Sequence, residues 1–143
     1  MEGDRMPGYW DATIKSVYAV EQGTENTLGV VKPGGAYDIL ADVEVGGGLI
    51  SFGGAKYVLT VTVRNQSTYQ IVYTDSATGT FPAQGGQQLP PTASQEIRVA
   101  VPDTGTANEG DVLDVIATFR LTSGVFTNAT SDTSPRFVVS NPL

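Results

Sequence analysis

The sequence predicts an all-β domain, an antiparallel sandwich of two sheets with seven to eight strands. Short stretches that alternate apolar and polar residues recur seven times along the chain, and this alternation commits one face of a strand to a core. Seventeen glycines and eight prolines supply many turns. No stretch keeps helical periodicity for three turns. Seven short strands in a chain of this length are typical of a sandwich.

The N-terminal half supplies the first strands of this sandwich. Alternation predicts a strand over residues 13–20, and a polar loop then leads to a short strand at 28–31. The Lys-Pro-Gly-Gly run at 32–35 has the composition of a turn. A strand over 36–45 ends in three consecutive glycines, and residues 49–52 are expected to form a short edge segment.

The remaining strands follow in the C-terminal half. We expect strands at 56–64, 69–74, 95–101, 111–122 and 135–140. The clearest is the stretch from Leu113 to Leu121, where every odd position is apolar. The predicted core is made of the inward positions of these strands: Ile39, Ala41, Val43, Leu59, Val61, Val63, Ile97, Val99, Val115, Ala117, Phe119, Phe137 and Val139.

Two segments are expected to be long and irregular. Residues 76–94 contain no charged side chain and are broken by glycine and proline, although 78–81 could form a short edge strand. Residues 123–134 are rich in Ser, Thr and Asn and are interpreted as a loop between the last two strands. Loops of this length in compact domains tend to carry function.

The layout resembles the immunoglobulin-like and fibronectin type III sandwiches over residues 12–140. The best local match is residues 109–115, which look like the corner that leads into strand F of those domains. Leu113 and Val115 occupy the places where immunoglobulin domains carry a tyrosine and a cysteine, so the resemblance implies architecture only. It implies one domain over residues 12–143, preceded by an N-terminal arm over residues 1–11.

Composition excludes several classes of function. The net charge of −7 repels phosphate and anionic lipid headgroups, so we expect neither nucleic-acid binding nor membrane insertion. The absence of His and Cys removes the usual near-neutral base and the best nucleophile, so no catalytic residue is assigned and the chain is not expected to be an enzyme. Asp42 and Glu44 lie two apart on one strand, point the same way, and are interpreted as solvent-facing charges.

One loop is a candidate cation site. Residues 103–111 bring together four oxygen-bearing side chains, Asp103, Asn108, Glu109 and Asp111. Hard cations such as Ca²⁺ bind several oxygens of this kind, although the spacing differs from that of an EF-hand. Turn hydrogen bonds from Asp103 and Asn108 would explain the same residues without a metal. We therefore expect no required cofactor, with Ca²⁺ as the alternative at this loop.

The two sheets are expected to differ on their outer sides. Outward positions on the strand at 36–45 are largely acidic, and Lys15 and Arg98 on its expected neighbours predict cross-strand ion pairs on a solvated surface. On the other sheet the outward positions are apolar or β-branched, which marks an interface unless the 76–94 loop covers them. These interface residues are Val58, Thr60, Thr62, Ile116, Thr118 and Val138, with Val72 and Val112 beside them.

The N-terminal arm carries three large apolar side chains, Met6, Tyr9 and Trp10. Such residues often dock into partner pockets. Alternatively, Trp10 covers the open end of its own sandwich.

These features predict a non-enzymatic structural or interaction module that acts as a subunit of a larger assembly. A phage or virus-like particle component, such as a decoration or tail-associated protein, fits best, with other subunits or further copies of the chain as partners. One alternative is a calcium- or carbohydrate-binding bacterial surface or adhesin domain. Another is an intracellular protein-binding inhibitor module that uses the 76–94 loop. The first residues lack the apolar core of a signal peptide, so a virion or the cytoplasm is favoured over secretion.

Overall fold

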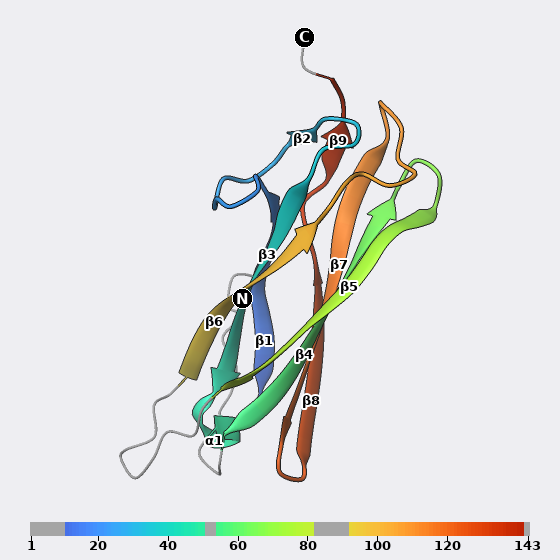
Figure 1. The fold of residues 1–143 in the computed structure, drawn as a ribbon. Helices are drawn as coiled ribbons and strands as arrows, with labels where there is room; N and C mark the ends of the chain where they lie inside the picture. Colours follow the sequence, from blue (N-terminus) through green and yellow to red (C-terminus); the bar gives the residue numbers. More distant parts are fainter. Residues whose placement is uncertain (1–10, 51–53, 82–91, 142–143) are drawn as a thin grey trace, which may run out of the picture.

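The computed structural model describes residues 11–50, 54–81 and 92–141, and it has two β-sheets packed face to face (Figure 1). Alternating burial along the strands gives each sheet one inward and one outward side. The strands are β1 (Ala12–Val20), β2 (Val30–Val31), β3 (Tyr37–Gly46), β4 (Ala55–Asn65), β5 (Gln70–Phe81), β6 (Thr92–Val101), β7 (Val112–Ser123), β8 (Phe126–Thr133) and β9 (Phe137–Val139).

The predicted division of strands between the sheets is confirmed. One sheet has the order β1-β3-β6, and the other has the order β2-β9-β7-β4-β5 with β8 paired to β7. All these pairings are antiparallel except that of β2 with β9. The β7–β8 hairpin and the C-terminal strand β9 lie toward opposite ends of the molecule (Figure 1).

The core lies between the sheets, and all thirteen residues predicted for it are buried. Its centre includes Phe119, which is fully buried and packs against Tyr57, with ring centroids 5.6 Å apart. Tyr57 also meets Phe81 edge-on at 5.8 Å, and Tyr37 meets Phe137 in the same way at 5.4 Å. Such ring contacts add to the free energy gained by burying apolar area.

Gly79 on β5 is required by this packing. It lies directly opposite Tyr57 in the β4–β5 register. A Cβ added at Gly79 would collide with the Tyr57 ring and hydroxyl. The aromatic ring therefore covers the glycine backbone, a cross-strand arrangement that stabilises a glycine within a strand.

The interpretation of residues 123–134 as a loop is wrong. Residues 126–133 form β8, a strand that pairs with β7 across a two-residue turn, Gly124-Val125. Gly124 has a φ of +60°, as expected for glycine at the first position of a tight hairpin turn. The described residues therefore contain nine strands rather than seven to eight.

Two further expectations are corrected. Residues 76–81 continue β5 and 92–94 begin β6, so only 82–91 of the expected long loop remain, and these lie outside the described residues. Gly47–Ile50 forms a single helical turn, α1, instead of the edge segment expected at 49–52. Leu49 and Ile50 are buried there, because the glycine-rich turn directs both side chains into the core.

Side chains close the two open sides of the sandwich. On one side the backbone N–H of Ala12 donates to Oδ1 of Asn128 at 3.4 Å, which links β1 to β8. On the other, Gln95 of β6 donates to the carbonyl oxygen of Thr80 at 2.9 Å and accepts from the Tyr57 hydroxyl at 3.3 Å. These contacts join edges of the two sheets where no backbone ladder runs between them.

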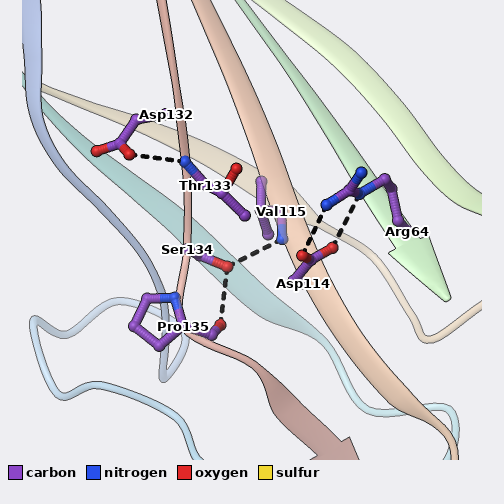
Figure 2. Close-up of polar contacts among 7 residues, drawn as sticks. All are labelled: Arg64, Asp114, Val115, Asp132, Thr133, Ser134 and Pro135. Atoms are coloured by element: carbon purple, nitrogen blue, oxygen red, sulfur yellow. Dashed lines mark hydrogen bonds and ion pairs between the residues drawn. The ribbon is translucent and has the colours of Figure 1, made fainter. Parts of the chain in front are cut away.

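Strand β7 changes partner along its length, and Ser134 marks the change (Figure 2). The backbone N–H of Ser134 donates to the carbonyl oxygen of Val115 at 2.8 Å. The Val115 N–H in turn donates to the Ser134 hydroxyl at 2.9 Å, and this hydroxyl donates to the carbonyl oxygen of Pro135. The side chain thus supplies a buried acceptor where the chain leaves β8 for β9.

Candidate functional site

The outer face is defined here as the side of the six-stranded sheet that is turned away from the three-stranded sheet. It carries all six sheet residues predicted as an interface. Val58, Thr60 and Thr62 alternate with buried residues of β4, and Ile116 and Thr118 do so on β7. Val138 lies opposite Val112 and Val30, which gives one apolar row across three strands.

None of these six residues is fully buried. Thr118 is exposed, and the other five predicted residues are partly buried by their neighbours in the sheet. Val72, also expected on this face, instead lies at a bulge in the β4–β5 register and packs against the core. The outer face is therefore a partly exposed surface of mostly β-branched side chains and not a second core.

Strands β5 and β8 widen the outer face and do not cover it. Thr78, Ser76 and Thr74 of β5 lie opposite Val58, Thr60 and Thr62. Ala129, Ser131 and Thr133 of β8 continue the same rows beyond β7. The hydroxyls of Thr60 and Ser76 lie 3.2 Å apart. Hydroxyl and aliphatic side chains are thus mixed across four strands, and the Ser76-Thr60-Thr118-Ser131 row carries a hydroxyl on each.

A depression of about 360 Å³ is hollowed into the middle of the outer face. It spans β4, β7 and β8 and is lined by Val58, Thr60, Thr118, Phe119, Arg120 and Ala129. Its volume falls in the usual range of ligand-binding pockets, and its lining combines apolar groups, hydroxyls and one guanidinium. Sequence reasoning missed Ala129 because it assigns β8 to a loop, and Arg120 because it selects only the apolar and β-branched outward positions of β7.

An ion pair also crosses the outer face, separated from the depression by the Thr62–Ile116 pair. Arg64 of β4 binds the Asp114 carboxylate of β7 through two nitrogens, at 3.0 and 2.8 Å (Figure 2). The Asp114 side chain is only 5% exposed and that of Arg64 is 39% exposed. The hydrogen bonds to Asp114 raise the pKa of Arg64 above its usual value. The bidentate geometry satisfies the buried carboxylate and neutralises this part of the face.

The candidate calcium loop uses its oxygens internally. Asp103 accepts the N–H of Gly105 at 2.7 Å, and Glu109 accepts from Asn141. The Asp111 carboxylate accepts the N–H of Asn108 at 2.9 Å and the side-chain amide of Asn65 at 2.8 Å. These two bonds, the backbone one first, lower the pKa of Asp111.

The loop residues therefore have the turn hydrogen bonds that were the alternative to a metal site. In the described part of the chain, no group of three acidic side chains is placed to hold a metal ion. The buried Asn65 lies outside this loop and is tied to it by the bond to Asp111, while its side-chain oxygen accepts the N–H groups of Ser67 and Thr68 in its own turn.

The predicted cross-strand ion pairs of the other sheet are confirmed. Arg98 donates to Asp38 at 2.7 Å, and Lys15 lies 3.1 Å from Glu44. The expectation that these carboxylates are solvated is wrong, because Asp38 is 3% and Glu44 is 7% exposed. The N–H of Gly23 also donates to Asp38, so the 21–26 turn covers that carboxylate.

Three of the residues predicted for partner binding, Met6, Tyr9 and Trp10, lie outside the described residues. Within the described ranges, no helix has the length and apolar character needed to cross a membrane.

Comparisons with known proteins identify no family. No protein-family model matches the chain, and no curated protein matches it. Among solved structures, a proposed β-galactosidase from Bacteroides fragilis has a TM-score of 0.43 and 17% identity, over 83% of this chain and 16% of that one. The sporulation control protein Spo0M from Bacillus subtilis has a TM-score of 0.43 and 15% identity, over 92% of this chain and 50% of that one.

A proposed ApaA protein from Bordetella pertussis has a TM-score of 0.36 and 12% identity, over 96% of this chain and 98% of that one. The chain spans half or less of the length of the first two proteins. The identities and TM-scores are low, and no conclusion about function is drawn from them.

Proposed function

We propose that this chain is a non-enzymatic interaction module and that its outer face binds another protein subunit of a larger assembly. One observation carries the proposal: the outer face is a wide surface of half-buried β-branched residues with a depression at its centre. A phage or virus-like particle component, of the decoration or tail-associated kind, is the form of assembly that we favour.

The free energy of apolar burial supports this use of the face. The complementary positions of β4 and β7 already supply the core, so Val58, Ile116 and Val138 are apolar area beyond what the fold requires. Removing such area from water contributes about 25 cal/mol per Å². The hydroxyl groups of this surface can also exchange hydrogen bonds with a partner, as interface rims do.

The chemistry of the described residues favours binding over catalysis. The chain has no His or Cys. The buried carboxylates Asp38, Glu44 and Asp114 are each engaged by a cation, so none is held ready as an acid or base. The cation at the central depression, Arg120, suits recognition of a carboxylate.

We further propose that the sandwich is of the immunoglobulin-like type. The order β1-β3-β6 in one sheet and β9-β7-β4 in the other matches the order of strands A-B-E and G-F-C in those domains. Strand β5 pairs with β4, as strand C′ pairs with C in variable-type domains.

A single substitution tests the proposed function. Ile116 points outward at the middle of β7, so Ile116→Lys puts a charge into the outer face without entering the core. We expect the native material to sediment as an assembly and the Ile116→Lys variant to sediment as a monomer. Its melting temperature should change by no more than a few degrees, because the lysine stem can lie along the sheet.

Val125→Lys is the matched control. Val125 is 94% exposed in the β7–β8 turn, away from the outer face. The same change from an aliphatic side chain to lysine should leave both the sedimentation coefficient and the melting temperature as they are. The proposal fails if Ile116→Lys also keeps both, since the outer face would then be ordinary solvent-exposed sheet.

A further inference from the structure

Each side of the sandwich presents two like charges on neighbouring strands. On the outer face, Lys56 of β4 lies opposite Thr122, and Arg120 of β7 lies opposite Val58, so the two cations are diagonal neighbours. On the outward side of the three-stranded sheet, Asp42 of β3 lies directly opposite Glu96 of β6. Like charges directly opposite each other destabilise a sheet, and diagonal neighbours are still within reach of long side chains.

Nothing in the described part of the chain neutralises either pair. The ion pairs there join Lys15 to Glu44, Arg64 to Asp114 and Arg98 to Asp38. Lys56, Arg120 and Glu96 are exposed, and Asp42 is partly exposed. The four uncompensated charges can therefore be reached from solvent.

Among the described residues of the paired strands, the two sides also differ in the balance of cations and carboxylates. The outer face carries three cations, Lys56, Arg64 and Arg120, and one carboxylate, Asp114. The opposite side, called the acidic face here, carries two cations, Lys15 and Arg98, and four carboxylates, Asp38, Asp42, Glu44 and Glu96. One side is thus complementary in charge to the other.

We propose that the partner bound by the outer face is a second copy of this chain, which docks its acidic face there. The proposal rests on the function proposed above and names the partner. Arg120 and Lys56 of one copy then meet Glu96 and Asp42 of the next, and each cation pair neutralises a carboxylate pair. Arg120 lines the central depression, where the hydroxyls of Thr60 and Thr118 lie beside it as further donors to a carboxylate.

Charge also decides the mode of stacking. A two-fold dimer of outer faces with its axis along the strands would bring the Lys56–Arg120 pair of each copy toward that of the other, which like-charge repulsion opposes. Docking of unlike faces leaves one outer face and one acidic face unused at the ends. Such a head-to-tail contact repeats, so it builds a ring or a filament instead of a closed pair.

Two charge reversals test this arrangement. Arg120→Glu reverses a charge on the outer face only, and Glu96→Lys reverses a charge on the acidic face only. Sedimentation velocity of the full chain at low salt should show the wild type self-associating and each variant binding itself at least about tenfold more weakly. An equimolar mixture of the two variants should regain the association, because one contact joins two intact faces and the next joins two reversed faces whose charges are again opposite. Raising the ionic strength should weaken the wild-type association.

Neither reversal is expected to destabilise the fold, because both positions are exposed, so a change in sedimentation reports association. Glu96→Lys removes the repulsion with Asp42, so its melting temperature should not fall although its self-association is lost. If Arg120→Glu proves less stable, Arg120→Gln and Glu96→Gln replace the reversals, and each should still weaken self-association.

Two outcomes would overturn the proposal. If Arg120→Glu is monomeric while Glu96→Lys associates like the wild type, copies pair through two outer faces. If the wild type is monomeric at all concentrations, the occupant is not a second copy. The proposed function itself would survive that second result, since it fails only when Ile116→Lys leaves the native assembly intact.

Discussion

Phe119 is fully buried between the sheets, and its position follows directly from the alternation of apolar and polar residues along β7. Replacing Phe119 with Ala removes the ring contact with Tyr57 and leaves a cavity. We expect a loss of about 3–5 kcal/mol in the free energy of unfolding, measured by denaturant titration.

Phe126→Ala is the control for that substitution, because Phe126 is 48% exposed at the start of β8. Its loss should be much smaller. An unchanged midpoint for Phe119→Ala would mean that the inward register of β7 has been assigned to the wrong face.

Some of the polar contacts could be predicted from the sequence, and others could not. That Arg98 and Lys15 pair with carboxylates of β3 could be predicted, because strand order and outward direction suffice. The bidentate contact between Arg64 and Asp114 could not, since it depends on which residues of β4 and β7 lie opposite each other. Burial of Asp38 could not be predicted either, because it depends on the fold of the 21–26 turn.

Among the elements, β8 is the strand that could not be predicted from the sequence. Its residues are Thr-, Ser- and Asn-rich, and without an apolar alternation they resemble a loop. The only local signal is Gly124, which starts a two-residue turn of the kind that joins hairpin strands. Since β8 lines the central depression with Ala129, missing this strand also hid that part of the site.

The change of partner along β7 gives a prediction at this scale. In Ser134→Ala the buried N–H of Val115 loses its acceptor. A buried donor without a partner costs about 1–3 kcal/mol, so the free energy of unfolding should fall by that amount. Denaturant titration measures it.

Ser131→Ala, at an exposed position of β8, serves as the comparison and should be nearly neutral. Equal stability of the two variants would mean that the Ser134 hydroxyl does not hold β7 where it passes from β8 to β9.

At the scale of the whole molecule, the two sides of one sandwich have different chemistry. The six-stranded sheet presents Val, Ile and Thr with an excess of cations, and the three-stranded sheet presents mostly carboxylates. The division of the main strands between the sheets could be predicted from the resemblance in strand order, and their outward residues from alternation, whereas β8 and its part of the outer face could not. The uncompensated charges could not be identified from the sequence, because their identification depends on the register of the strands.

The central claim is that the outer face is covered in the native assembly, and thiol labelling tests it most directly. The chain has no cysteine, so Thr118→Cys places a single thiol at the depression. Thr118 is exposed in the isolated chain. We expect a maleimide reagent to label this thiol much more slowly in the native assembly than in the Ile116→Lys background. A thiol at Val125 should react quickly in both. Equal labelling rates at Thr118→Cys and Val125→Cys in the native assembly would contradict the account.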